Sequence, residues 1–340
     1  MRISLDRLAA DLQKQMAPLY VLFGDETLLI LETIDLILSR ARQQGFTERE
    51  IYTVEQHFNW QNVLNANNSL SLFGTQKIID IRIPSGKPGK EGAAAIDAYC
   101  RALSPDVLTL ITLPKIDKVT QNTQWFKTLE SSGSVIPINN IEREQLPQWI
   151  ARRLAQQQQS CDPTTLQFMA DQVEGNLLAT HHEIQKLALV YPAGNLTLEQ
   201  IRAVIFNVAR YDIYQLTDAM IALDSVRYSR ILNGLQEEGT APSLILNVVA
   251  EQIRQLITVQ KGINAGQSTS AVLQSARVWG SRQKTVIYAA RHINAKQLYR
   301  AILHAARIDR MIKGIVDGDI WNELLLFIKI VAIDLDVSLS

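Results

Sequence analysis

Short apolar runs alternate with stretches of helical spacing over the first 140 residues. The runs are rich in β-branched residues and are bounded by Gly, Pro, Ser or Asn, which is typical of strands. Five strands are predicted: Leu19–Phe23, Glu50–Val54, Lys77–Ile83, Val107–Leu113 and Val135–Ile138. Helices are predicted between them, notably at Gly92–Leu103 and Thr123–Glu130. Strands that alternate with helices predict a mostly parallel sheet that is covered on both faces.

Beyond about residue 140 the strand pattern stops and only helical spacing remains. One group of predicted helices comprises Glu142–Gln159, Thr164–Val173, Leu177–Val190 and Leu198–Phe206. A second group begins near Tyr211 with Ile213–Leu223, Val226–Glu237 and Ser243–Ala265, and continues to Val337. The pattern therefore predicts an α/β domain at 1–140, followed by two all-α domains at 141–209 and 210–340.

Composition excludes some classes of protein. Lys and Arg together number 34, as do Asp and Glu. This balance argues against a protein that binds polyanions through its net charge. A basic surface confined to one part of the chain is still compatible with it. Cys100 and Cys161 have no zinc-type spacing, so we expect reduced thiols and no metal. The amino terminus has no secretory apolar region, and the apolar stretch near the carboxyl terminus is interrupted by Lys329. We expect a cytoplasmic protein with no membrane contact.

The turn after the first strand, Phe23-Gly24-Asp25-Glu26-Thr27, lies where a nucleotide-binding α/β domain carries its phosphate loop. That loop requires GxxxxGK[ST], whereas this turn has one glycine, no lysine and two carboxylates. Carboxylates at a helix start repel a triphosphate. No other catalytic motif is apparent, so we expect neither ATPase nor nucleotidyltransferase chemistry.

Ser69-Leu70-Ser71-Leu72-Phe73-Gly74 precedes the third predicted strand. A short apolar segment that ends in Leu-Phe suits insertion into an apolar groove of a partner, where aromatic side chains are common anchors. The alternative is that these residues cover the core at the edge of the sheet.

Nine Lys or Arg residues and one acidic residue, Asp309, lie between Arg277 and Lys313. Arg277, Trp279, Arg282 and Lys284 combine cations with an aromatic ring, the combination that binds phosphates and stacks on bases. These four residues are the candidate DNA contacts. The alternative is a solvated basic face with Trp279 in the core.

Four short stretches resemble one family, in the same order along the chain. They are Tyr20–Glu26 with Leu28-Leu29, Glu174–Ala179 with Glu183–Ala188, Arg277–Trp279, and Ile320–Leu324. Together they resemble the delta subunit of the bacterial DNA polymerase III clamp loader.

The resemblance implies a degenerate AAA+-type first domain that binds no ATP, a lid-type second domain and a collar as the third. The collar would join delta-prime and the gamma/tau subunits, which bind the ATP, within the DNA polymerase III holoenzyme. Clamp-binding peptides of the Gln-Leu-Ser/Asp-Leu-Phe type match at Leu70, Ser71, Leu72 and Phe73, with Ser69 in place of the Gln. Leu70, Leu72 and Phe73 become the candidate contacts to the sliding clamp.

The implied function is to bind and open the clamp for loading on primed DNA, without catalysis. The main alternative is a helical nucleic-acid-binding protein with an α/β appendage. An active P-loop-type ATPase is disfavoured by the missing lysine.

Overall fold

The computed structural model describes residues 1–68, 76–205, 209, 211–280 and 282–332. The chain divides into two units, one formed by Met1–Ala170 with Leu177–Phe206, the other by Asp171–Asn176 with Asn207–Ser340. The first unit holds the sheet and a helical segment, and the second is helical throughout its described part. The predicted fold class, an α/β domain followed by all-α domains, is confirmed. The predicted joints at 140 and 209 stay predictions.

The first unit is built on a five-stranded sheet in the order β2-β3-β4-β1-β5. All neighbouring strands pair in parallel. The strands are β1 Leu19–Gly24, β2 Phe46–Thr53, β3 Gln76–Arg82, β4 Val107–Leu113 and β5 Ser134–Ile138. Each predicted strand is therefore present, and the parallel arrangement is as predicted.

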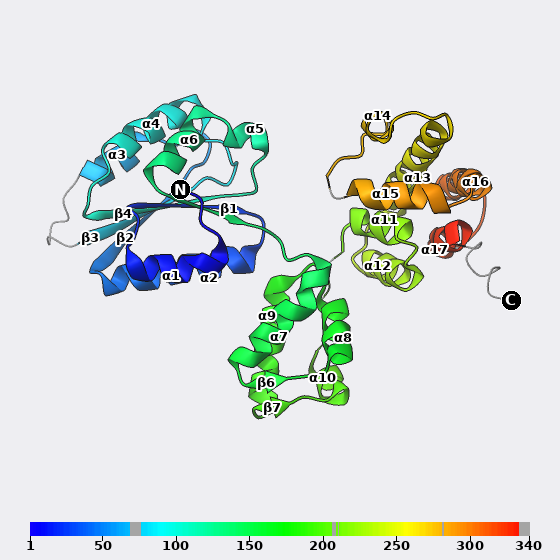
Figure 1. Cartoon of the computed structure of the whole chain (residues 1–340), viewed down its shortest axis with the longest axis horizontal. Helices are drawn as coiled ribbons and strands as arrows, with labels where there is room; N and C mark the ends of the chain where they lie inside the picture. Colours follow the sequence, from blue (N-terminus) through cyan, green and yellow to red (C-terminus); the bar gives the residue numbers. More distant parts are fainter. Residues whose placement is uncertain (69–75, 206–208, 210, 281, 333–340) are drawn as a thin grey trace. The chain divides into compact units, whose positions relative to one another are not determined.

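Helices cover both faces of this sheet (Figure 1). Helices α1 Leu5–Lys14 and α2 Thr27–Gln43 lie on one face. Helices α3 Gln61–Asn68, α4 Gly89–Arg101, α5 Lys118–Gln121 and α6 Gln124–Ser132 lie on the other. All six residues of β1 are buried, which explains why a central strand reads as a continuous apolar run.

Strand β2 begins four residues before the predicted strand. The sequence pattern missed its first half because those residues are largely polar or charged, which is possible in a strand at the edge of the sheet. Charges of opposite sign on β2 and β3 are matched in space. Arg49 Nη2 lies 2.6 Å from Asp80 Oδ2, and Lys77 Nζ lies 3.2 Å from Glu50 Oε1. Only the pairing of the two strands makes this charged segment a favourable strand.

The helical segment of the first unit begins with η1 Arg143–Gln145. The helices that follow are α7 Leu146–Gln156, α8 Pro163–Val173, α9 Leu177–Val190 and α10 Leu198–Val204. The end of α8, from Asp171, belongs to the second unit. Asp162 caps α8 by accepting from the backbone N–H groups of Thr164 and Thr165, as its sequence Asp-Pro suggests. The purely helical prediction missed β6 Gln159–Ser160 and β7 Gly194–Asn195, a two-residue parallel ladder too short for a period to be visible.

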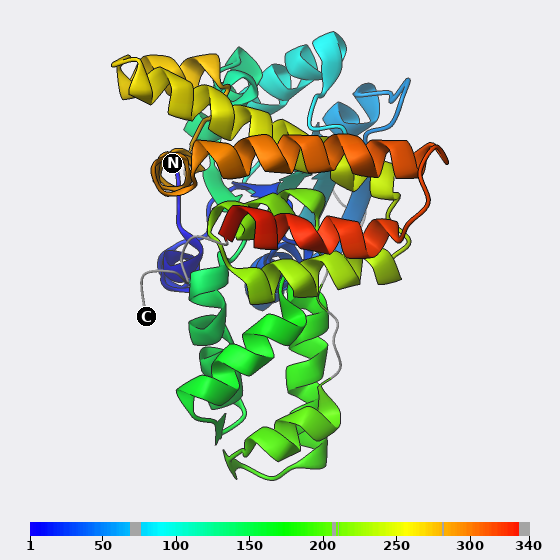
Figure 2. The same ribbon diagram turned by 90° about the vertical axis from the view of Figure 1, so that its right-hand side faces the viewer.

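The second unit consists of packed helices around one apolar core. They are α11 Ile213–Ile221, α12 Ser225–Glu237, α13 Pro242–Asn264, α14 Thr269–Ser275, α15 Arg282–His292, α16 Ala295–Ile312 and α17 Ile320–Ala332. The long helix α13 packs against α16, and α16 and α17 lie side by side (Figure 2). In the core, the fully buried Tyr228 donates its hydroxyl proton to the carbonyl of Leu324 at 2.9 Å.

Candidate functional site

The turn from β1 into α2 is closed by the chain's own groups. A Cβ atom on Gly24 would lie 2.0 Å from the carbonyl oxygen of Ile138, so glycine is required here by the close approach of β5. Asp25 Oδ1 accepts from the backbone N–H of Lys115 at 2.9 Å. Glu26 accepts from the N–H of Leu28 at 3.4 Å, at the start of α2.

These bonds change the electrostatics of the turn. Burial raises the pKa of the Glu26 carboxyl, while its bond to the Leu28 N–H opposes that shift. A carboxylate thus already occupies the helix start, where backbone N–H groups would otherwise be free for an anion. No lysine lies in the turn. Chemically, the site has acceptors where a phosphate needs donors.

The candidate clamp contacts Leu70, Leu72 and Phe73 lie outside the described residues. The residues on either side of them are well anchored. Asn67, near the end of α3, is buried and donates its side-chain amide to the carbonyl of Ala102 at 2.6 Å. Strand β3 begins at Gln76, at the end of the sheet where the strands start, and the β1–α2 turn lies at the opposite end (Figure 1).

Three of the four candidate DNA contacts are exposed on the second unit. Trp279 is 62% exposed, and Arg277 and Lys284 are also exposed. Val278 between the first two is buried, so the chain here alternates between the surface and the core. The alternative that Trp279 belongs to the core is wrong.

Arg282 has a different environment from the other three. Its Nε lies 2.8 Å from Asp218 Oδ1, and its Nη2 donates to Gln252 Oε1 at 2.7 Å and Thr217 Oγ1 at 3.1 Å. Burial raises the pKa of the Asp218 carboxyl, and the Arg282 guanidinium opposes that shift. Arg282 therefore joins the start of α15 to α11 and α13.

The sequence reasoning missed an exposed aromatic pair on α15. Tyr288 is 54% exposed and stacks on the ring of His292, with centroids 4.0 Å apart and planes 26° apart. Lys284, Tyr288 and Arg291 follow at intervals of four and three residues, which places them on one helical face. Helical spacing counted from Lys284 would have found this face.

The charge of this region is strongly one-sided. From residue 252 to residue 308 the chain has no Asp or Glu, yet it has nine Lys or Arg residues. Acids from other segments compensate some of them: Asp218 pairs with Arg282, and Glu323 lies 3.2 Å from Arg307. We name the exposed set Arg277, Trp279, Lys284, Tyr288, Arg291 and His292 the basic aromatic surface.

The described part of the chain lacks two further features. It contains no group of three or more His, Cys, Asp or Glu residues that could hold a metal ion. None of its helices is both long and apolar enough to cross a membrane.

Comparisons with known proteins agree along the chain. Residues 20–139 match the family model described as DNA polymerase III, delta subunit, and residues 210–328 match that of the DNA polymerase III delta subunit, C-terminal domain. DNA polymerase III subunit delta of Escherichia coli (strain K12) is 25% identical over 323 residues, which are 95% of this chain and 94% of that protein.

The corresponding protein of Haemophilus influenzae is 26% identical over 334 residues, which are 95% of this chain and 97% of that protein. Among solved structures, the Bacillus subtilis DNA clamp loader delta protein matches 95% of this chain and 99% of its own, at 19% identity and a TM-score of 0.53. That structure shares the fold.

We expect Arg282→Ala to destabilise the protein, because it leaves the half-buried Asp218 carboxylate and the buried Gln252 amide without their partner. The free energy of unfolding should fall by about 1–2 kcal/mol, since Arg282 is partly exposed. Lys284→Ala, two residues away and exposed, should change it by less than about 0.5 kcal/mol. Urea unfolding followed by circular dichroism measures both. Equal effects of the two substitutions would contradict a special anchoring role for Arg282.

Proposed function

Because this chain belongs to the DNA polymerase III delta subunit family, we propose that it is a non-catalytic clamp-loader subunit that binds and opens the ring-shaped sliding clamp. Opening allows the clamp to be loaded on primed DNA during replication. The proposal rests first on the Leu70-Ser71-Leu72-Phe73 segment, which matches the apolar part of a clamp-binding peptide. The partners are the sliding clamp, delta-prime, the gamma/tau subunits and primed DNA.

In this mechanism Leu72 and Phe73 enter an apolar pocket of one clamp protomer near a ring interface. Burying such side chains contributes about 1.5–3 kcal/mol each. Opening follows if the segment binds the strained or open interface more tightly than the closed one, because only a difference in affinity shifts an equilibrium. The elements that flank this segment are fixed in the core, because α3 carries the buried Val63 and β3 carries the buried Ile79 and Ile81. In this proposal, movement of the α/β domain is therefore passed to the bound clamp.

The second unit supplies the joint to the other loader subunits in this proposal. Its helices form their own core, so it can hold a position in a ring of subunits without support from the α/β domain. ATP then acts through partner subunits, whose conformational changes expose or hide the clamp-binding segment. The β1–α2 turn and the first residue of β3, Gln76, lie at opposite ends of the sheet, which supports separate roles for the turn and the clamp-binding segment.

The basic aromatic surface is proposed to touch DNA in the loaded complex. Exposed cations supply phosphate neutralisation, and Trp279 and Tyr288 supply faces on which bases stack. Arg282 contributes by fixing the start of α15, since its guanidinium is already bonded to three neighbours.

We expect no binding of ATP by the isolated chain, because Asp25 and Glu26 place carboxylates where a triphosphate would sit and no lysine offsets them. Isothermal titration with Mg-ATP should show no saturable heat. The ATP-binding gamma/tau subunit, titrated in the same buffer, is the positive control. A stoichiometric binding isotherm would contradict this proposal and revive the ATPase alternative.

Truncation of the stacking residues should weaken DNA binding. Trp279→Ala and Tyr288→Ala should each lose about 1–3 kcal/mol of affinity for a primed oligonucleotide if each ring stacks on one base. Arg277→Ala and Lys284→Ala should each lower the salt dependence of the binding constant by about one counterion. Fluorescence anisotropy across a salt series measures both effects.

Tyr214→Ala is the matched control, because Tyr214 is an exposed aromatic residue on α11, outside the basic stretch. Its affinity for DNA should equal that of the unaltered protein. Affinities and salt slopes that are unchanged by all four substitutions would exclude DNA contact at this surface.

The decisive test is binding of the purified chain to its sliding clamp, with Leu72→Ala/Phe73→Ala beside the unaltered protein. Loss of two buried anchors should cost at least about 2–3 kcal/mol, roughly 30- to 150-fold in affinity. Leu189→Ala/Val190→Ala is the matched control, since it truncates two adjacent exposed apolar residues of the same unit.

Absence of binding by the unaltered protein would exclude clamp opening and favour the alternative of a nucleic-acid-binding helical protein. Binding that survives the double substitution would keep the clamp as partner and move the contact to other residues.

A further inference from the structure

Within the first unit, an ion pair joins the α/β domain to the helical segment that follows it. Glu32 lies on α2, and Arg153 lies on α7. Arg153 donates from Nη1 to Oε1 of Glu32 and from Nη2 to Oε2, each at 2.5 Å. The two residues are 121 positions apart in the chain. The pair therefore connects the helix that follows β1 to the α-helix that follows the whole sheet.

The Arg153 guanidinium is held in place from a second side. Its Cζ lies 4.6 Å from the ring centroid of Trp149, which is one turn earlier on α7. The side chains of Arg153 and Glu32 are only 17% and 34% exposed. Most surface ion pairs contribute little, because ordering two flexible side chains costs entropy. A bidentate pair that is stacked and partly shielded from water loses less, so this contact can hold two elements together.

His181 brings a third helix, α9, to the same place. Its Nδ1 is buried and has no hydrogen-bond partner among the residues that the structure describes. Burial lowers the pKa of the His181 imidazole, and the nearby Arg153 guanidinium lowers it further, while the Glu32 carboxylate opposes both. A neutral His181 packs beside the pair and leaves both oxygens of Glu32 to Arg153.

Close packing is missing beside the ion pair. A cavity of about 400 Å³ is lined by the start of α1, the residues after β5 and one face of α7. Ser4 and Asp6 contribute from α1, Asn139 from the linker, and Gln148 and Trp149 from α7. A polar cavity of this size admits water, and it provides none of the interlocking contacts that fix two elements in a protein core. Contact with α1 therefore does not set the orientation of α7.

We propose that Glu32 and Arg153 form a latch that fixes α7 and α9 to the α/β domain, so that these parts of the first unit move as one body. The chain that connects them, residues 139–142, has no helix or strand, and a linker of this kind does not set an orientation by itself. Any rotation of the α/β domain then carries these helices with it. The inference concerns the chain alone and does not depend on the clamp or DNA proposals.

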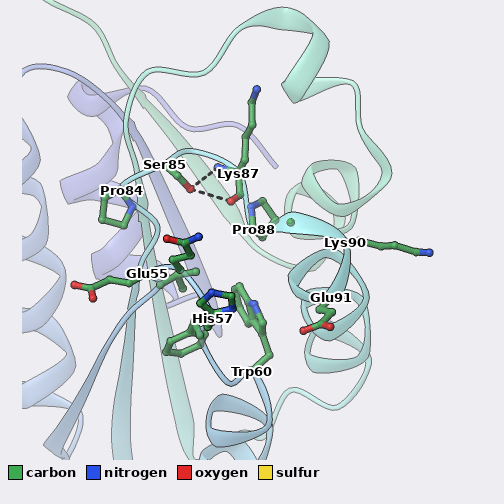
Figure 3. A pocket seen from close by; sticks show the side chains of 13 residues that line it. Glu55, His57, Trp60, Pro84, Ser85, Lys87, Pro88, Lys90 and Glu91 are labelled. Carbon is green, nitrogen blue, oxygen red and sulfur yellow. Dashed lines mark hydrogen bonds between the residues drawn. The ribbon is translucent and has the colours of Figure 1, made fainter.

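The test measures distances between two spin labels on the full chain by pulsed electron paramagnetic resonance, with Cys100 and Cys161 replaced by alanine. The labels are placed at Lys90→Cys on α4 and Ala188→Cys on α9, where both side chains are exposed. Lys90 lines a different cavity, of about 710 Å³, which lies within the α/β domain. Figure 3 shows its side chain directed away from the aromatic rings of that cavity. A label there reports on the α/β domain without touching the latch.

The unaltered chain should give a single narrow distribution of distances. Arg153→Glu should raise the population of detached conformations about tenfold or more, because repulsion replaces charge-assisted hydrogen bonds. Exchange of the two charges, Glu32→Arg with Arg153→Glu, should make the distribution narrow again. Arg101→Glu is the matched control, because it reverses the exposed partner of the Arg101–Asp97 pair on α4 and should leave the distribution unchanged.

Glu32→Gln is a milder variant that keeps the shape of the side chain, and it covers the case in which circular dichroism shows that Arg153→Glu is unfolded. It should also broaden the distribution. The latch is overturned if either variant folds and stays as narrow as the unaltered chain. A charge-exchanged variant as broad as Arg153→Glu would overturn it as well, because the loss would then be one of packing. A broad distribution in the unaltered chain would show that the two parts already move separately.

Discussion

The parallel sheet of the first unit requires cover on both of its faces, and most of the fold follows from that requirement. Strand β1 lies inside the sheet between β4 and β5, and all six of its residues are buried. Helices on each face satisfy the requirement, and because the strands are parallel, each crossover carries the chain back to the same starting end. The carboxyl ends of all the strands therefore lie at one end of the sheet, and their amino ends lie at the opposite end.

This separation gives the two ends of the α/β domain different chemistry. At the carboxyl end, Gly24, Asp25 and Glu26 complete bonds and close contacts within the chain, so the position of a phosphate loop is kept without its donors. At the same end of the sheet, α4 begins without a side-chain cap. At the amino end, the buried Asn67 donates its side-chain amide to the carbonyl of Ala102, and β3 begins at Gln76.

In the helical unit, electrostatics separates residues that hold the structure from residues that face solvent. A stretch without acidic residues would repel itself if all of its cations were packed together. Carboxylates from α11 and α17 neutralise Arg282 and Arg307, which brings these helices against α15 and α16. Arg277, Lys284 and Arg291 stay at the surface beside Trp279 and Tyr288. The same local composition therefore serves both packing and the exposed basic surface.

Local patterns in the sequence determined the five strands, the parallel α/β class, the helical remainder and the missing phosphate-loop lysine, because each depends on residues close together in the chain. Tertiary structure decided what depends on distant partners. The charged start of β2 becomes a strand only beside Asp80 and Lys77. Arg282 is distinguished from Lys284 by partners at least thirty residues earlier in the chain, Thr217, Asp218 and Gln252. Trp279 lies at the surface because its neighbour Val278 is directed into the core. Burial and ion pairing are properties of the assembled chain, so no local pattern could supply them.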